Sequence, residues 1–302
     1  MNKRVLLLGA TGTIGRAVAQ TLDDLGFGTV CVVRKGSDVP TELAKLEIVT
    51  GEPSAAFKRT TFDIVISCIA SRSGVPEDAW AVDYKTNSEV LKAAQENGIS
   101  QFILLSAICV QKPQLAFQHA KLAFEKELRE SGLTYSIVRP TAFFKSLSGQ
   151  IERVKSGKPY LLFGDGELTR CKPISNADLA RYIVSCIDDR EKHDRVLPIG
   201  GPGPAITPLE QGKELFALTG KTPRYRRVPV AIMDVAISAL RMAGLFSKRA
   251  AAKAEYAKIG RYYATESMLV WDEKAQRYDE AATPEYGSET LSEHYSKAVA
   301  KT

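Results

Sequence analysis

The sequence has few of the residues that build metal centres and disulfide frameworks. Its 302 residues include five cysteines and three histidines, with no Cys-x-x-Cys pair and no metal-ligand spacing among the histidines. Internal repeats and low-complexity tracts are also absent. The N-terminal apolar segment is short and already belongs to an expected strand, so a signal peptide is not expected. These absences favour a reduced, metal-free, cytoplasmic protein.

A strong excess of one charge is also missing. The formal net charge is +6, and the basic residues are spread along the chain apart from the cluster Arg224, Arg226 and Arg227. A nucleic-acid-binding surface normally needs a more concentrated basic patch, so nucleic acid is not an expected partner. The positive charge suits an anionic small molecule or a membrane surface equally well.

Short apolar runs alternate with amphipathic stretches through the first half of the chain. Strands that are apolar on both faces, separated by helices, are typical of a parallel sheet with helices on each side. We therefore predict an α/β fold with a doubly wound, Rossmann-like parallel sheet. The expected strands are residues 5–8, 29–33, 46–49, 64–67, 102–105 and 135–138, and the expected helical stretches are residues 13–25, 77–96 and 115–130.

A glycine-rich turn, G-A-T-G-T-I-G at residues 9–15, follows the first apolar run and opens the first helical stretch. A dinucleotide-binding loop requires this context of strand, turn and helix. Gly9 permits the tight turn, Gly12 lets the backbone approach a pyrophosphate, and Gly15 lets the helix pack closely on the strand. The alternative is a turn with a merely structural role.

The second expected strand ends without the acidic residue that usually holds the ribose 2′-hydroxyl of NAD. Arg34 and Lys35 stand there instead, with Ser37 nearby. A guanidinium offers a planar, permanently charged fork for a 2′-phosphate, which a carboxylate would repel. We therefore predict NADPH as the cofactor. The alternative is a solvated basic turn.

Ligands of such sheets gather beyond the carboxyl ends of the strands, and four loops of this sequence meet that condition. Small residues at Cys68-Ile69-Ala70 would let the adenine ribose and phosphates pass. Ser106 ends its strand where a hydroxyl would face the nicotinamide. Each feature alone is also compatible with ordinary loop chemistry. The four loops, expected to line one crevice, are residues 9–15, 68–73, 106–109 and 139–144.

The arrangement resembles the short-chain dehydrogenase/reductase superfamily in its extended or atypical branch, over at least residues 5–144. That superfamily carries a serine and a Tyr-x-x-x-Lys helix, and the matching positions are Ser106, Phe117 and Lys121. Phe117 cannot donate a proton, so the site is poorly suited to alcohol/ketone interconversion. The resemblance implies that Lys121 holds the nicotinamide ribose. The alternatives are a helix-surface lysine, and a Phe117 that packs against the nicotinamide ring or the substrate.

Local sequence words in a fixed order are similar to those of the NADPH-dependent divinyl chlorophyllide 8-vinyl reductases, almost from end to end. The words L-S-A-I-C-V-Q-K-P and C-K-P-I-S are the most particular, whereas R-P-T and the glycine loop occur in many relatives. The words are L-L-S-A-I-C-V-Q-K-P (104–113), R-P-T-A-F-F-K-S-L (139–147), F-G-D-G (163–166), C-K-P-I-S (171–175), I-G-G-P-G (199–203) and T-P-E-Y-G (283–287).

The resemblance implies reduction of the 8-vinyl group of a divinyl chlorophyllide or protochlorophyllide to ethyl, in chlorophyll or bacteriochlorophyll biosynthesis. Hydride addition to the terminal vinyl carbon would leave negative charge on the adjacent carbon, where the conjugated macrocycle spreads it. The protein then has chiefly to align two flat rings. Two alternatives stay open: a reductase of another substrate, and a non-catalytic NADPH-binding sensor or assembly factor.

A smaller, interleaved substrate-binding lobe is expected in this branch of the superfamily. We assign residues 1–142 to an NADP-binding Rossmann domain, to which a helix at 176–188 and a strand at 195–199 return. The substrate-binding lobe is then formed by residues 143–175 and 202–302.

The predicted catalytic positions are Lys121, Ser106 and Phe117. The final proton has four candidate sources, namely bulk water, His119, Cys109 and Tyr160. The predicted cofactor-binding residues are Gly9, Thr11, Gly12, Thr13, Ile14, Gly15, Arg34, Lys35, Cys68, Ile69, Ala70, Ser106, Lys121, Pro140, Thr141 and Phe143.

The apolar, partly aromatic stretch at residues 160–163 is a candidate wall for the macrocycle. Lys145, Arg170 or Lys172 would meet its propionate. The alternative for each is a core strand with solvated flanking charges. The residues that we expect to touch the substrate are Phe144, Tyr160, Phe163 and Lys172.

Residues 228–246 are rich in apolar side chains but contain Asp234 and Arg241, which makes them a poor transmembrane candidate. At helical spacing they form a stripe flanked by basic residues. We expect either a lid or core helix, or an interfacial helix that makes a peripheral contact with photosynthetic membranes through residues 228–249. The stripe consists of Ile232, Val235, Ala236, Ala239, Leu240 and Ala243.

Overall fold

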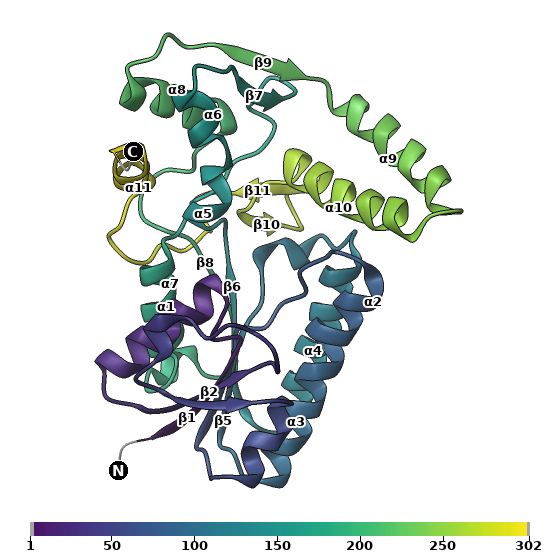
Figure 1. Cartoon of the computed structure of the whole chain (residues 1–302). Helices are drawn as coiled ribbons and strands as arrows, with labels where there is room; N and C mark the ends of the chain where they lie inside the picture. Colours follow the sequence, from purple (N-terminus) through teal and green to yellow (C-terminus); the bar gives the residue numbers. More distant parts are fainter. Residues whose placement is uncertain (1–2, 301–302) are drawn as a thin grey trace.

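The computed structural model describes residues 3–300 and centres on a seven-stranded parallel sheet in the order β3-β2-β1-β4-β5-β6-β8 (Figure 1). The predicted fold class is thereby confirmed, and each expected strand is present. The strands are β1 (Arg4–Leu8), β2 (Gly28–Val33), β3 (Glu47–Thr50), β4 (Ile64–Ser67), β5 (Gln101–Leu105), β6 (Thr134–Pro140) and β8 (Arg195–Ile199).

Helices cover both faces of the sheet, because alternate residues of the inner strands are apolar on both sides. Val5 and Leu7 of β1 pack into one core with α1 and α7, whereas Leu6 and Leu8 pack into a second core with α3 and α4. The segment carrying α7 and β8 thus returns to the sheet, where β8 pairs with β6. These helices are α1 (Thr13–Asp24), α3 (Asn87–Glu96), α4 (Ala116–Glu130) and α7 (Asn176–Ser185).

The expected helical stretch at residues 77–96 is interrupted by a π-helix. It begins as α2 (Pro76–Ala79), widens into the π-helical segment η3 (Trp80–Thr86) and continues as α3. A π-segment inserts residues relative to the α-helical repeat, so side chains after it face a different direction. Apolar periodicity does not reveal such a change.

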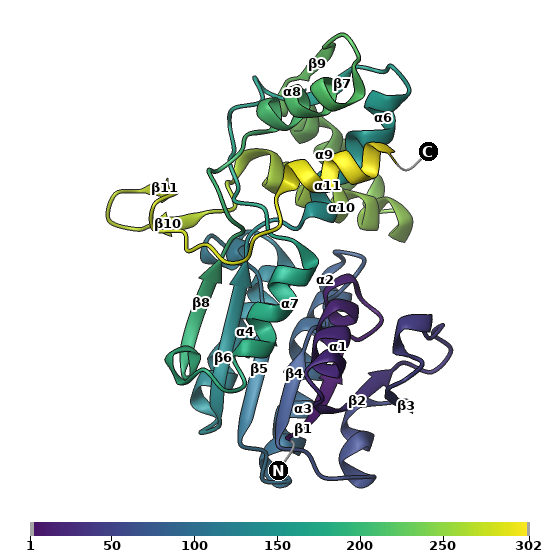
Figure 2. The same cartoon turned by 90° about the vertical axis from the view of Figure 1, so that its left-hand side faces the viewer.

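The remaining segments lie over the carboxyl ends of the strands (Figure 2). Helices α6, α8 and α11 share a third apolar core with strand β7, which pairs with β9. The elements of this region are α5 (Phe144–Leu147), α6 (Ile151–Lys155), β7 (Tyr160–Phe163), α8 (Pro208–Thr219), β9 (Tyr225–Val228), α9 (Val230–Gly244), α10 (Lys248–Thr265), β10 (Val270–Asp272), β11 (Arg277–Asp279) and α11 (Leu291–Ala300).

Helices α9 and α10 form a hairpin that projects from the rest of the molecule (Figure 1). Ile237 is the buried residue of α9, and a Cβ on Gly244 would lie 3.1 Å from the Cα of Ala251 on α10. The apolar stripe expected at Ile232 and Val235 lies instead on the exposed side, so α9 is not a core helix. Between residues 3 and 300, no helix combines the length and apolar character that crossing a membrane requires.

Candidate functional site

The glycine loop after β1 is too tightly closed for side chains at two positions. Gly9 has a φ of 77°, and a Cβ there would lie 2.6 Å from the carbonyl oxygen of Cys68. A Cβ on Gly15 would lie 2.0 Å from the carbonyl oxygen of Gly9. A Cβ built on Gly12 would contact only that carbonyl oxygen, at 3.2 Å, so the outer side of the turn is open. A phosphate can therefore approach the N-terminus of α1, which begins directly after Gly12.

The other residues predicted for this loop lie at the same helix end. Thr11 and Thr13 are half-buried and Ile14 is buried, with α1 beginning at Thr13. From α5 of the second lobe, Lys145 Nζ lies 3.1 Å from Oγ1 of Thr13. A cation therefore lies beside the phosphate-binding turn. Lys145, one of three candidates for the substrate propionate, thus lies at the glycine-rich turn and does not line the cavity described below.

Arg34 and Lys35 are exposed directly after β2. Nearby, Asp78 of α2 accepts hydrogen bonds from the backbone N–H of Ser73, at 3.0 Å, and of Arg72, at 3.1 Å. Burial alone would raise the pKa of Asp78, but these hydrogen bonds and the charge of Arg34 lower it below its usual value. The Arg34 guanidinium thus lies beside the loop that follows β4, at the carboxyl edge of the sheet.

Lys121 is buried on α4 and forms an ion pair with Asp83 of the π-helical segment, with Nζ 2.9 Å from Oδ1. The backbone N–H of Ser71 donates to the other carboxylate oxygen at 3.3 Å. Asn87 donates to the Asp83 carbonyl at 3.0 Å and accepts from the Ser67 hydroxyl at 2.7 Å. This polar chain links the end of β4 to α4, so the alternative of a helix-surface lysine is wrong.

Ser106 donates its hydroxyl to Glu125 of α4, with Oγ 2.5 Å from Oε1. Glu125 is buried and also accepts from Nε of Arg139 at 3.2 Å. The Ser106 hydroxyl therefore helps to satisfy the buried Glu125 carboxylate, which lies between β5, α4 and β6. A buried charge needs several hydrogen-bond donors. This orientation differs from the expected one, in which the hydroxyl faces the nicotinamide.

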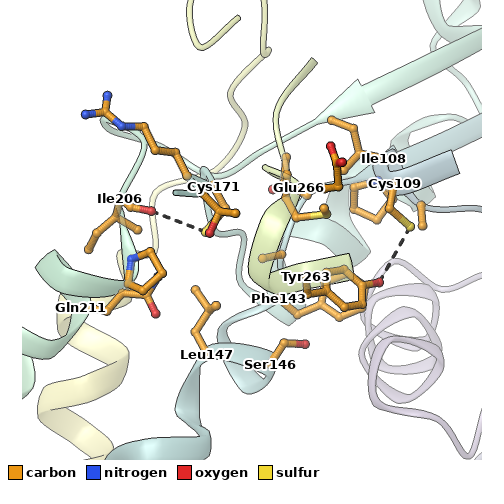
Figure 3. A pocket seen from close by; sticks show the side chains of 18 residues that line it. Ile108, Cys109, Phe143, Ser146, Leu147, Cys171, Ile206, Gln211, Tyr263 and Glu266 are labelled. Carbon is orange, nitrogen blue, oxygen red and sulfur yellow. Dashed lines mark hydrogen bonds between the residues drawn. The ribbon is translucent and has the colours of Figure 1, made fainter. Parts of the chain in front are cut away.

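A cavity of about 370 Å³ lies between the sheet edge and the second lobe (Figure 3). Residues 107–109 and 140–143, which follow β5 and end β6, line its sheet side. Two of the four expected loops therefore line this cavity, and they contribute Pro140, Thr141 and Phe143. No residue of the other two loops, 9–15 and 68–73, lines it. Lining residues from the lobe include Ser146, Leu147, Arg170, Gln211, Tyr263 and Glu266.

The four residues expected to touch the substrate do not line this cavity. Phe144 and Tyr160 are buried in the core shared by α6, α8 and α11, and Phe163 is partly exposed at the end of β7. Lys172 is buried with its Nζ 2.5 Å from Glu285. Of the basic candidates for the propionate, Arg170 is the one that lines the cavity. Tyr160 and Leu162 of the aromatic stretch are core because this face of β7 packs on α6, α8 and α11.

The candidate proton donors also differ in position. Cys109 lines the cavity, and its Sγ lies 3.8 Å from the hydroxyl of Tyr263 on α10. His119 is exposed on α4, and Tyr160 is in the core. Phe117 packs in a small apolar cluster with Cys109 and Tyr262. Cys109 is therefore the one side chain of these candidates that reaches the cavity.

Glu266 closes the cavity beside Tyr263 and remains ionised. Its carboxylate accepts from Lys112 Nζ at 2.8 Å and from the Tyr278 hydroxyl at 2.5 Å. Burial alone would raise the pKa of Glu266, but these two donors hold it below its usual value. The Lys112 ammonium also lies 4.2 Å from the ring centroid of Trp271. This network fixes the C-terminal end of α10 to the β10–β11 hairpin.

Two comparisons decide the family. A family model described as NAD(P)H-binding matches residues 9–190. The divinyl chlorophyllide a 8-vinyl-reductase of Cucumis sativus is 46% identical over 98% of this chain and 76% of its own length. The chain belongs to the divinyl chlorophyllide a 8-vinyl-reductase family. The relative is named as chloroplastic.

Two further proteins show how widely this fold is used. A photosystem II assembly factor of Cyanophora paradoxa is 28% identical over 77% of this chain and 74% of its own length. The solved structure of a UDP-glucose 4-epimerase from Thermotoga maritima superposes with a TM-score of 0.71. It covers 98% of this chain and 97% of its own at 18% identity, so it shows the fold alone. Members of the 8-vinyl-reductase family thus share an architecture with nucleotide-sugar enzymes.

Sequence reasoning missed three residues of this reductase site. Glu125 lies four residues after Lys121 on α4, so helical spacing would have placed it on the same face. Asp83 was concealed by the π-helix, which changes the direction of the side chains that follow. Tyr263 comes from a helix far along the chain, and no local pattern connects it to the end of β5.

Proposed function

We propose that this protein reduces the 8-vinyl group of a divinyl chlorophyllide to an ethyl group, with NADPH as the reductant. The observation that carries the proposal is the cavity where residues 107–109 and 140–143 face the second lobe, in a chain of this reductase family. The cavity is largely apolar and lies at the sheet edge where the nucleotide loops end, which suits a macrocycle edge placed against a nicotinamide.

The residues present fit a phosphorylated dinucleotide. The open outer side of Gly12 and the N-terminus of α1 suit a pyrophosphate, and Lys145 adds a positive charge beside Thr13. We assign the 2′-phosphate to Arg34 with Lys35, and the nicotinamide ribose to Lys121. When bound, NADPH supplies the hydride. Cofactor contacts by Cys68, Ile69 and Ala70 remain a prediction, whereas the Ser106 hydroxyl is already bound to Glu125.

The protein's own contribution is to orient the pigment and to exclude water. Apolar side chains such as Ile108, Leu147 and Ile206 surround the space in which the vinyl edge would lie. Arg170 has 55% of its side chain exposed and pairs only loosely with Glu280, at 3.7 Å. It is therefore our candidate for the propionate carboxylate, in place of Lys172, which is already paired.

A non-catalytic assembly factor is the second candidate function. It is favoured by Phe117, because binding alone needs no proton donor, and by the 28% identity to a photosystem II assembly factor. The higher identity to the reductases favours the enzyme. The two candidates differ in whether pigment is turned over.

We also propose that the α9–α10 hairpin rests on the surface of an anionic photosynthetic membrane, with the rest of the protein in the cytoplasm. Leu245 and Phe246 at its tip are 81% and 92% exposed, and Val235 and Met242 are 70% and 72% exposed. An apolar stripe beside positive charge is typical of helices that bind anionic lipid. The exposed basic residues at the tip are Arg241, Lys248, Arg249 and Lys253.

The reaction is tested by anaerobic incubation of the purified protein with divinyl chlorophyllide a and NADPH, and separately with NADH. A small blue shift of the Soret band with NADPH is the expected result, with a much slower shift with NADH. Demonstrable NADPH binding without any pigment turnover would favour the assembly factor. A parallel reaction with protochlorophyllide as the substrate shows which of the two pigments is reduced faster.

A further inference from the structure

The nucleotide domain has no tyrosine at position 117, but the second lobe supplies a phenol to the same cavity. Among the residues that the structure describes, Tyr263 of α10 is the one tyrosine that lines it. The residue is 44% exposed, and its hydroxyl lies 3.8 Å from Sγ of Cys109, just beyond the end of β5 (Figure 3). A phenol from the lobe therefore reaches the sheet edge where the chemistry is expected.

The neighbouring tyrosine fixes this position. Tyr262 is 2% exposed, and its hydroxyl donates to the carbonyl oxygens of Cys109 at 2.8 Å and Lys112 at 3.0 Å. Its ring meets that of Tyr263 edge to face, with centroids 5.7 Å apart. Because Tyr262 ties α10 to the segment after β5, the next side chain on the helix is directed into the cavity. The phenol is thus held by buried contacts on a regular helix.

We propose that Tyr263 is a catalytic residue that donates the proton completing the vinyl reduction, an inference that rests on the function proposed above. Hydride reaches the terminal vinyl carbon and leaves an electron pair on the carbon beside the macrocycle. The O–H bond of Tyr263 breaks, a C–H bond forms at that carbon, and the phenolate takes a proton from solvent through the exposed side of the ring. The vinyl group gains two hydrogens, and the cofactor is oxidised.

Three other polar groups of the cavity, those of Glu266, Thr141 and Cys109, are less suitable donors. Glu266 is held ionised by Lys112 and Tyr278. The hydroxyl of Thr141 already donates to the carbonyl oxygen of Lys172. The thiol of Cys109 is 1% exposed, and recovery of its proton from solvent would have to pass through another group.

Protonation of Tyr263 at neutral pH is secured by its surroundings. Tyr263 is partly exposed, but its hydroxyl lies beside the buried Cys109, and burial there raises the pKa of the phenol above its ordinary value. The residue therefore carries its proton until the carbon beside the reduced vinyl terminus, which bears the added negative charge, is placed next to it.

The test is Tyr263→Phe, which keeps the ring and removes the hydroxyl alone. General-acid catalysis typically contributes roughly 100- to 10,000-fold, so we expect kcat to fall at least 100-fold. The KM for divinyl chlorophyllide and the Kd for NADPH, measured by fluorescence quenching, should stay within about twofold because the ring packing is unchanged. The Soret perturbation on binding pigment without reductant should also persist. Tyr256→Phe, on an exposed tyrosine of the same helix, is the matched control with unchanged kcat.

Three outcomes would overturn the inference, and they separate it from the proposed function. Wild-type kcat in Tyr263→Phe would show that another group or water donates the proton, while the reductase activity stands. A raised pigment KM at unchanged kcat would make Tyr263 a packing residue of the substrate site. Absence of turnover in the wild-type protein, with NADPH bound, would remove the proposed function and the inference together.

Discussion

Nζ of Lys121 lies 2.9 Å from Oδ1 of Asp83, in a nearly water-free ion pair between α4 and the π-helical segment. The Lys121 side chain is 10% exposed and that of Asp83 is fully buried. Loss of either partner should destabilise the folded protein, because the remaining partner would be an uncompensated buried charge. The pair also sets the direction of the ammonium group that we assign to the nicotinamide ribose.

Asp83→Asn should destabilise the protein and weaken NADPH binding together. Loss of one partner of a buried ion pair typically costs about 3 kcal/mol of unfolding free energy, which urea denaturation would measure. Glu89→Gln is the matched control, because its pair with Lys85 spans 3.9 Å between exposed side chains. Equal stability of the two variants would contradict a structural role for the pair.

Arg34→Glu should shift the cofactor preference from NADPH toward NADH. A hydrogen bond to a charged group contributes about 1.5–3 kcal/mol, so the KM for NADPH should rise roughly 10- to 100-fold, and repulsion adds to this. The KM for NADH should not rise. Arg195→Glu makes the same charge change at the amino end of β8 and should leave both KM values unchanged. An unaltered KM for NADPH in Arg34→Glu would show that another residue binds the 2′-phosphate.

Glu266→Gln should lower the stability at pH 7 but not in acid. The pKa of Glu266 is below its ordinary value because Lys112 and Tyr278 donate to the carboxylate, so its stabilisation is present above the unfolded pKa. That stabilisation is lost as the pH falls through the lowered pKa of the folded state. Urea unfolding of variant and wild type should therefore differ at pH 7 and converge as the pH falls through that lowered pKa. Glu273→Gln, at an exposed position, should match the wild type throughout.

Replacing Leu245 and Phe246 by serine should abolish binding to anionic liposomes while leaving pigment reduction in detergent intact. Their side chains contribute the most exposed apolar surface of the hairpin, and each buried CH₂ contributes about 0.8 kcal/mol. Flotation with phosphatidylglycerol vesicles at low salt measures the effect, and high salt should weaken the wild-type binding. Failure of the wild-type protein to float at low salt would exclude the membrane contact.

The sheet could be predicted from the sequence because its signals are local. Apolar runs such as Val5–Leu8 and Ile64–Ser67 are buried on both faces, so they stand out without knowledge of their neighbours. The glycine loop is equally local, since the clash of a Cβ on Gly15 with Gly9 arises within one turn. These features place the loops that follow β1 and β4 at the carboxyl edge of the sheet.

The rest of the site depends on contacts between distant segments. Tyr160 and Phe163 have the composition of a pigment wall, but the pairing of β7 with β9 puts Tyr160 into the core. Tyr263 lies 154 positions after Cys109, and the two meet only because α10 packs on the segment after β5. Asp83, the partner of Lys121, lies in the π-helical segment, which cannot be recognised from apolar periodicity.

The most direct test of the central claim is to follow deuterium from the cofactor into the pigment. Divinyl chlorophyllide a would be incubated anaerobically in ordinary water with NADPH that carries deuterium at both C4 positions of the nicotinamide, and the product would be analysed by mass spectrometry. The account predicts a product whose 8-ethyl group has gained one deuterium and one ordinary hydrogen. A pigment of unchanged mass, or an ethyl group without deuterium, would contradict direct hydride transfer and with it the proposed reductase.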